Sequence, residues 1–316
     1  MNDLLTALKA LAEPTRLRLL NLCAQAELTV SELTLLLGQS QPRISRHLKL
    51  LYQAGILDRH REGSWVYFQL ASKGIGRKLA RVLVSLIPEK NPTVKLDSAR
   101  LQALLEERAQ KATEYFNNNA TNWNLVRSLH VEDKDVEARL LELLPDGDPQ
   151  SLLDLGTGTG RLLELFSPLI PSLVGVDSSS EMLKVARSNL EIQGIRNCTL
   201  RQGDVRQLRF QSDFFDVVTV HQVLHFMENP EEVVGEATRV LKSTGCLIVV
   251  DFEEHGMETL REEHSHRWLG FRAETIRGWM NKAGLTKIDH YALAGGELTV
   301  GIWVGQTIKP EAPSDE

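Results

Sequence analysis

The chain contains, from residue 151 to residue 160, the stretch Ser151-Leu-Leu-Asp154-Leu-Gly156-Thr-Gly158-Thr-Gly160. Its apolar run predicts a buried strand, and the glycine-rich turn leads into a helix that begins near Arg161. Glycines permit positive φ angles and remove the Cβ atoms that would keep a ligand away from the backbone. The stretch therefore predicts a strand, a turn and a helix N-terminus that together meet a ligand, although similar turns also close α/β units that bind nothing.

Acidic residues near the ends of the next two predicted strands strengthen the ligand hypothesis. Val174-Gly-Val-Asp177 predicts a strand that ends in an acid, 19 residues after Gly158. At about this distance a doubly wound sheet presents a carboxylate to ribose hydroxyls. Gly203-Asp204-Val205 follows a third predicted strand. The spacing therefore predicts a nucleoside ligand.

Because the motif begins with an acid inside the first strand, it resembles the class I S-adenosylmethionine-dependent methyltransferases more closely than it resembles dinucleotide-binding proteins. The resemblance implies an α/β, Rossmann-like, seven-stranded methyltransferase fold and S-adenosylmethionine or S-adenosylhomocysteine as the bound nucleoside. Strands are predicted at 151–155, 173–177, 198–202, 215–220, 245–251, 286–293 and 297–305, the last two as an antiparallel hairpin.

The resemblance also assigns roles to individual residues. Asp154 would order the ammonium group of the ligand, Asp177 would accept hydrogen bonds from the ribose, and Asp204 would meet the adenine amine. The full set expected to contact the nucleoside from this part of the chain is Asp154, Gly156, Thr157, Gly158, Gly160, Asp177, Ser178, Met182, Asp204, Val205 and His221.

Catalytic residues are harder to assign. Methyl transfer can proceed by proximity and orientation alone, because the sulfonium is already a strong electrophile. The candidates for acid or base roles are His221, His225, His264 and His266. The alternative for His221 and His225 is a hydrogen-bonded histidine that lines the cofactor pocket.

The segment 260–271 is dense in titratable residues and falls where this fold places substrate-recognition elements. It predicts an acceptor site, a lid, or structural hydrogen bonding. Glu263, His264, His266 and His255 are residue types that bind metals, but a His-x-His pair on a helix points its rings about 200° apart. No metal is therefore predicted.

The composition favours two soluble domains. The chain has 316 residues, of which 42% are hydrophobic and 25% are charged. It has no run of 18 apolar residues and no apolar signal core, so we expect no membrane segment and a cytoplasmic protein. Cys23, Cys198 and Cys246 are scattered, which argues against disulfides, thiolate metal clusters and arsenic methylation.

The net charge of −6 is unevenly distributed. Residues 1–90 hold 13 Lys and Arg against 7 Asp and Glu, a net +6, whereas the remaining residues hold 23 against 35, a net −12. Since residues 1–90, the basic front of the chain, are positively charged and the remainder is negatively charged, we expect only the basic front to bind a polyanion.

The basic front reads as small helices, among them Thr29–Leu37 and Ser40–Leu51, joined at Gly38 into a helix-turn-helix. In the second of these, Ile44, Leu48 and Leu51 share one face, and the basic residues lie opposite, as in a helix that enters the major groove. The alternative is a solvated basic face. The predicted DNA-binding residues are Ser40, Gln41, Pro42, Arg43, Ser45, Arg46, His47, Lys49, Arg59 and Arg61, although His47 lies towards the core side.

A basic β-hairpin follows at Asp58–Leu70, with Gly63 in its turn, and forms the wing. With the motifs Ser40-Gln-x-x-Ile-Ser-Arg-His-Leu-Lys-x-Leu and Arg61-x-Gly-x-Trp-Val-Tyr, residues 1–88 resemble an ArsR-type winged helix, an α+β domain. The resemblance implies a homodimer on palindromic operator DNA, with the terminal helices, here including 75–87, at the dimer contact.

One departure from this family bears on the inducer. Metal-sensing members carry a Glu-Leu-Cys-Val-Cys-Asp-Leu box, but here the run is Glu27-Leu-Thr29-Val-Ser31-Glu-Leu33. Hydroxyl oxygens are poor substitutes for thiolates on a soft metalloid. We therefore expect the inducer to bind elsewhere in the chain.

Residues 89–130 are predicted to connect the two domains, with a linker after Pro88, a polar helix over 96–116 and a turn at 117–120. Tyr115, Phe116, Ala120 and Trp123 resemble a segment that folds over the cofactor in many small-molecule methyltransferases, so Tyr115 and Trp123 join the expected nucleoside contacts. The alternative is aromatic packing between domains. The methyltransferase-like domain is predicted at 131–309, followed by an acidic tail at 310–316.

These observations lead to two functional hypotheses. The first is a transcriptional regulator, expected to be a repressor, whose second domain binds S-adenosylmethionine or S-adenosylhomocysteine as effector. The second is an active methyltransferase for a small molecule, with a fused autoregulatory DNA-binding domain. Methylation of DNA or protein is disfavoured, because the Asn/Asp-Pro-Pro-Tyr/Phe segment of amino-methylating enzymes is missing.

Overall fold

The computed structural model describes residues 1–62, 65–71, 74–88, 90–128, 132–145 and 147–307, without the side chains of residues 62 and 112–128. The chain divides into two compact units. The first comprises Met1–Lys111 together with Glu191–Arg196, and the second comprises Ala112–Leu190 with the residues from Asn197 onward. Each unit has its own hydrophobic core. No helix in the described ranges is both long enough and apolar enough to cross a membrane.

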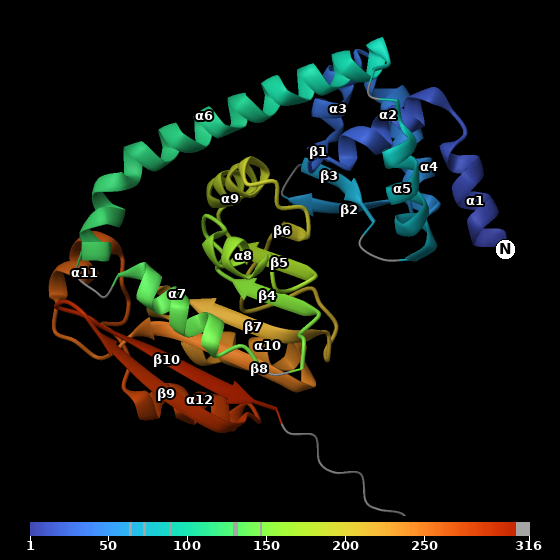
Figure 1. Ribbon diagram of the computed structural model, residues 1–316. Helices are drawn as coiled ribbons and strands as arrows, with labels where there is room; N and C mark the ends of the chain where they lie inside the picture. The colour runs from blue at the N-terminus through green and yellow to red at the C-terminus, as the bar shows by residue number, and fades with distance from the viewer. Residues whose placement is uncertain (63–64, 72–73, 89, 129–131, 146, 308–316) are drawn as a thin grey trace, which may run out of the picture. The chain divides into compact units, whose positions relative to one another are not determined.

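The first unit is the predicted winged helix-turn-helix (Figure 1). The three-stranded sheet has the order β1-β3-β2, with both strand pairs antiparallel. The hairpin of β2 and β3 is the predicted wing; Gly63, which we placed in its turn, lies outside the described residues. The elements of this unit are α1 (Asn2–Leu11), α2 (Pro14–Cys23), β1 (Leu28–Thr29), α3 (Val30–Leu37), α4 (Gln41–Gln53), β2 (Leu57–Glu62), β3 (Trp65–Leu70), α5 (Gly74–Leu86) and the start of α6 (Pro92–Ser128).

The helix-turn-helix is set by local signals at its two junctions. Thr29 caps α3 in a capping box, in which its hydroxyl accepts from the Glu32 backbone N–H and the Glu32 carboxylate accepts from the Thr29 N–H. Gly38 ends α3 in the left-handed region, with φ +62°. Ser40 is the N-cap of α4, as predicted, but its side chain forms no capping hydrogen bond.

Helix α6 is one continuous helix of 37 residues. The turn predicted at residues 117–120 is therefore wrong, since the backbone there is helical. Asparagine lowers helix propensity by only about 0.7 kcal/mol per residue, and no Gly or Pro interrupts the helix. In the first unit, α6 is held by Asp97, whose carboxylate accepts from Arg18 Nε and Nη2 of α2 at 2.6 and 2.7 Å. Leu101 on the same helix is buried in the core of the unit.

The second unit is built on the predicted seven-stranded sheet (Figure 1). Its strands are β4 (Ser151–Leu155), β5 (Ser172–Asp177), β6 (Cys198–Gln202), β7 (Phe215–His221), β8 (Leu241–Phe252), β9 (Thr286–Ala294) and β10 (Thr299–Gln306). The order is β6-β5-β4-β7-β8-β10-β9, parallel from β6 to β8, with β10 antiparallel to both β8 and β9. The order reverses at β4, so the carboxyl ends of β4, β5 and β7 face a common crevice where such sheets bind ligands.

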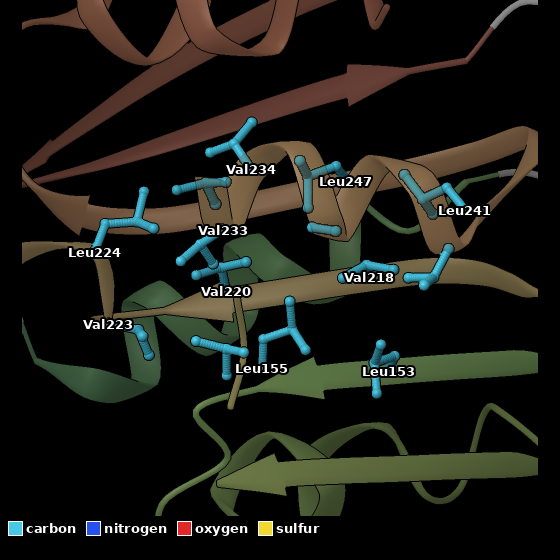
Figure 2. Close-up of a cluster of buried hydrophobic side chains, with 14 of the residues drawn as sticks. Leu153, Leu155, Val218, Val220, Val223, Leu224, Val233, Val234, Leu241 and Leu247 are labelled. Atoms are coloured by element: carbon cyan, nitrogen blue, oxygen red, sulfur yellow. The ribbon is translucent and has the colours of Figure 1, made fainter. Parts of the chain in front are cut away.

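Apolar side chains hold this sheet against its helices. Figure 2 shows leucines and valines of β4, β7, β8 and α10 that point towards one another, and those labelled are all buried. Ile276 and Met280 of α12 extend the same core. The helices of the unit are α7 (Asp133–Glu142), α8 (Arg161–Phe166), α9 (Ser180–Ile192), the 3-10 helix η1 (Leu224–Phe226), α10 (Pro230–Val240), α11 (Glu258–His264) and α12 (Ala273–Lys282).

Candidate functional site

The glycine-rich turn after β4 is locked to the neighbouring strand by its own backbone. The N–H groups of Gly156 and Thr157 both donate to the carbonyl of Val176 on β5, at 2.8 and 3.0 Å. Gly156 has φ +71°, and a Cβ atom there would lie 2.3 Å from Cγ2 of Val223. Only glycine fits this position, because a side chain would meet both backbone strain and a packed valine. The turn therefore has a fixed shape, and Gly156 and Gly158 in it are only partly buried.

Asp177 joins the ends of two strands. Its carboxylate accepts from the backbone N–H of Gly158 at 2.9 Å and from that of Ser179 at 2.8 Å. Each carboxylate oxygen has a second lone pair, so these bonds leave acceptor capacity for ribose hydroxyls. The predicted ribose acceptor and the predicted glycine turn are thus brought together, at hydrogen-bond distance.

Asp154 lies beneath the turn and is almost fully buried. Burial raises the pKa of its carboxyl group to about 6, and the hydrogen bond donated by the Thr219 hydroxyl at 2.7 Å opposes this shift. A buried carboxylate at this pKa gains from a nearby cation. The position is consistent with the expected contact to the ligand's ammonium group, which stays a prediction.

The expected adenine contacts lie at the ends of β5 and β6. Met182 is half-buried and Val205 is buried, whereas Ser178 and Asp204 are exposed. Asp204 already has a partner, because Arg206 donates to both of its carboxylate oxygens, at 3.0 and 2.7 Å. These bonds lower the pKa of Asp204. A contact from Asp204 to an adenine amine would have to share this carboxylate with Arg206.

The end of β7 carries an unusual backbone conformation. His221 is half-buried there, and the next residue, Gln222, has φ +53° and donates its N–H to the carbonyl of Val250 at 2.7 Å. A non-glycine residue in the left-handed region is costly and occurs often at functional sites. The turn directs the following segment, with Val223, back against Gly156.

Two of the four candidate catalytic histidines are stacked on each other. The rings of His225 and His266 have centroids 4.1 Å apart, and both residues are buried. His225 Nδ1 lies 2.7 Å from Oδ1 of Asp251, which is fully buried at the end of β8. Burial lowers the pKa of His266 to about 3, and His225, His255 and His264 act in the same direction.

Glu263, His264, His266 and His255 are the residues considered above as metal ligands. Within the described residues, no group of three or more histidine, cysteine, aspartate or glutamate side chains is arranged to hold a metal ion. Cys23 and Cys246 are buried, which raises the pKa of each thiol to about 12, and neither forms a disulfide.

The side chains of Tyr115 and Trp123, the expected contacts from α6, lie outside the described residues.

The helix α4 presents a polar, basic face. Ile44, Leu48 and Leu51 are buried, as expected. His47 is only 13% exposed at its side chain and faces Glu13, with its Nδ1 3.8 Å from Oε2. The other predicted DNA contacts of this helix and the wing are exposed: Ser40, Gln41, Pro42, Arg43, Ser45, Arg46, Lys49, Arg59 and Arg61.

Two parts of the chain match known families. Residues 13–59 match the family described as bacterial regulatory protein, arsR family, and residues 153–249 match the family described as methyltransferase domain. The protein joins an ArsR-family domain to a class I methyltransferase domain. The predicted two-domain fold is confirmed.

Relatives of the methyltransferase domain are similar over part of the chain. The uncharacterized methyltransferase YcgJ of Bacillus subtilis (strain 168) is 36% identical over 100 residues, which cover 32% of this chain and 40% of that protein. The ubiquinone/menaquinone biosynthesis C-methyltransferase UbiE of Vibrio parahaemolyticus is 30% identical over 177 residues, which cover 46% of this chain and 68% of that protein. A complex of the Haloferax volcanii Trm112 methyltransferase activator with a methyltransferase has a TM-score of 0.51 at 20% identity, covering 62% of this chain and 97% of that one. This last likeness supports the fold alone.

Three residues of the candidate site were not predicted from the sequence. Asp251 pairs with His225, Thr219 bonds Asp154, and Val223 packs on Gly156. A signal existed for Asp251, since an acid that ends the apolar run Leu247–Val250 follows the same pattern as Asp177. No comparable signal marks Thr219 or Val223, which resemble the other apolar and β-branched residues of their strand and turn.

Proposed function

We propose that the protein is a DNA-binding transcriptional regulator whose methyltransferase domain binds S-adenosylmethionine or S-adenosylhomocysteine as effector. The observation that carries this proposal is the glycine turn, which Val176 and Asp177 order through hydrogen bonds and in which Gly156 and Gly158 are only partly buried. It occurs in one chain with a helix-turn-helix whose basic face is exposed. A nucleoside that bound two states of the protein with a tenfold difference in affinity would shift their balance by about 1.4 kcal/mol.

The ArsR-family domain supports an effector that binds elsewhere. Thr29 stands where metal-sensing members carry a thiolate, and its hydroxyl caps α3. Glu32, its partner in the capping box, also pairs with Arg108 at 2.8 Å, which lowers the pKa of that carboxyl group. These side chains therefore stabilise a helix N-terminus, and oxygen donors of this kind suit a soft metalloid poorly.

The exposed basic face of α4 supports operator DNA as the binding partner. Arg43, Arg46 and Lys49 are exposed on one face of α4, as phosphate or base contacts require. On the wing, the guanidinium of Arg59 lies 4.5 Å from the centre of the Tyr52 ring, which orients this cation next to α4. We propose that the protein acts as a repressor when it is bound to this operator DNA.

A homodimer is part of the same proposal. Helices α1 and α5 contact each other and leave large apolar side chains exposed: Leu5, Leu8, Ile75, Val82 and Leu86. Such a patch is expected at a protein interface. An ArsR-family dimer would use these two helices and place two copies of α4 on a palindromic site.

The test is a titration of operator DNA binding at fixed salt, because phosphate contacts make affinity salt-dependent. Fluorescence anisotropy of labelled promoter DNA is measured with S-adenosylmethionine and, separately, S-adenosylhomocysteine. We expect at least one nucleoside to change the DNA affinity. In Asp177→Asn, which weakens the bonds to Gly158 and Ser179, the response should diminish, whereas Asp289→Asn on the exposed face of β9 should respond like wild type. Nucleoside binding with no change in DNA affinity would contradict the regulator.

Methyl transfer to a small molecule is the second candidate function. The observation that favours it is the buried pair of His225 and Asp251, which is close to the turn segment that packs on Gly156. Transfer of a labelled methyl group from S-adenosylmethionine to a metabolite in a cell extract would support this candidate, and its absence across a broad extract would count against it.

A further inference from the structure

A cluster of imidazoles surrounds one carboxylate in the methyltransferase domain. We call Asp251, His225, His255, His264 and His266 the histidine cluster. Asp251 is the second-last residue of β8, His225 lies in η1, and the other three lie in the segment that follows β8. His225 and His266 stack, and His255 and His264 help to lower the pKa of His266. Four histidines beside one buried carboxylate call for a physical explanation.

The protonation of His225 follows from its partner. An ionised carboxylate only accepts hydrogen bonds, and Asp251 Oδ1 lies 2.7 Å from His225 Nδ1. Asp251 also accepts from the backbone N–H of Phe252 at 2.8 Å. The proton of His225 therefore resides on Nδ1, and Nε2 keeps its lone pair. A carboxylate that holds an imidazole in this tautomer is the arrangement of a general base.

Other members of the cluster have polar atoms without partners. His255 Nδ1 accepts from the backbone N–H of Met257 at 3.2 Å, so its proton resides on Nε2, which is buried and unbonded. Nε2 of His264 and Nδ1 of His266 are also buried and unbonded. Buried polar atoms almost always have a partner. The missing partner of these nitrogens is therefore expected to be a group that donates or accepts hydrogen bonds.

Aromatic rings border the cluster, and one of them is exposed to solvent. The ring of Phe226 lies 4.0 Å from that of His225 and 5.2 Å from that of His266, and Phe226 is 43% exposed. Val223, two residues before His225, packs on the glycine turn at Gly156. Val223 therefore links His225 along the chain to the turn expected to hold the methyl donor, and the aromatic rings beside the cluster suit contact with a planar molecule.

We propose that the histidine cluster is an acceptor site, in which His225 is the general base that removes the proton from a hydroxyl group on a planar, neutral acceptor. This inference rests on the nucleoside site of the proposed function. The acceptor oxygen forms a bond to the methyl carbon as the bond from that carbon to the sulfonium sulfur breaks. The hydroxyl proton passes to Nε2 of His225, and the products are a methyl ether and S-adenosylhomocysteine. Asp251 stabilises the imidazolium, and the unbonded nitrogens of His255, His264 and His266 hold the acceptor.

The experiment compares two probes that differ in their need for a base. Phenol is neutral at pH 8, whereas 4-nitrophenol is largely ionised. Transfer of labelled methyl from S-adenosylmethionine is measured for wild type, His225→Gln and the matched control His290→Gln, whose ring stacks on Trp303 outside the cluster. Binding of S-adenosylhomocysteine is measured calorimetrically on the same samples.

We expect wild type to methylate both probes. In His225→Gln, phenol methylation should fall about 10²- to 10⁴-fold, the usual contribution of a general base. Methylation of 4-nitrophenol should fall less than about tenfold, because an ionised acceptor has no proton to lose. His290→Gln should match wild type. If His225→Gln no longer binds the nucleoside, Asp251→Asn provides the same comparison with the imidazole retained.

Two results would overturn the inference while leaving the regulator intact. The first is wild-type protein that binds S-adenosylhomocysteine but methylates neither probe. The second is an equal loss for both probes in the variants, which would assign His225 and Asp251 a structural role. A wild-type protein that binds no nucleoside would overturn the proposed function, and the acceptor site with it.

Discussion

Replacing Gly156 by alanine provides a strong test of how the glycine turn is built. Gly156 has φ +71°, and an added Cβ would lie 2.3 Å from Val223 Cγ2. A left-handed residue other than glycine costs about 1–2 kcal/mol. Overpacking a buried position costs about 1–3 kcal/mol more. Gly156→Ala should therefore lower the free energy of unfolding of the methyltransferase domain by about 2–5 kcal/mol.

Gly284 is a control for the backbone part of this cost, and it lies in the same unit as Gly156. Its φ is +96°, and no atom lies within 4 Å of the Cβ that alanine would add. Gly284→Ala should therefore cost only about 1–2 kcal/mol. The difference between the two variants measures the contact with Val223 separately from the backbone strain.

Hydrogen exchange of the β7 amides, followed by mass spectrometry, reports the opening of this domain's core separately from the ArsR-family domain. Adding Val223→Ala to Gly156→Ala removes the obstructing methyl groups, and the double-mutant cycle should show a coupling of about 1–3 kcal/mol. Equal losses in Gly156→Ala and Gly284→Ala, or no coupling in the cycle, would refute the reasoning.

Three further predictions address charge. Burial raises the pKa of Asp154 to about 6 from an ordinary 3.8, so the native state binds the proton more tightly; this stabilisation is present below about pH 4 and is lost as the pH rises through 6. Hydrogen exchange measured between pH 4 and 7 should show the free energy of unfolding of the wild type fall by about 3 kcal/mol. Asp154→Asn should abolish this fall. Arg46→Ala on α4 should weaken operator binding and reduce the salt slope by about one, whereas Lys95→Ala on the exposed face of α6 should leave both unchanged; equal effects would contradict the assigned interface. Asp97→Asn should cost the first unit about 2–3 kcal/mol, because its arginine partner loses a buried, bidentate carboxylate. Removing the exposed Glu107 should cost less than about 1 kcal/mol, and similar losses in both variants would show that burial does not decide the value of these pairs.

The parts of the fold that depend on local pattern were predictable. Strand β4, the turn at Gly156 and the acid at Asp177 follow from an apolar run, glycine spacing and strand length, all of which act within a few residues. The two faces of α4 follow from helical periodicity, since Ile44 and Leu48 recur every four residues. The turn predicted in α6 failed because asparagine is only a weak helix breaker, and the absence of Gly and Pro let the helix continue.

The sequence by itself determined the two domain classes, the succession of strands along the chain and the residue types at the carboxyl ends of those strands, because these depend on spacing along the chain. Only the tertiary structure decided which side chains meet. Asp251 and His225 are 26 residues apart, and Thr219 and Asp154 are 65 residues apart. Thr219 and Asp154 meet because β7 and β4 are adjacent strands, and His225 meets Asp251 because η1 packs against β8. Buried polar groups such as these almost always have a hydrogen-bond partner. Asp251 can orient His225 only because the folded chain places them in contact. Val223 likewise requires glycine at position 156 only in the folded chain.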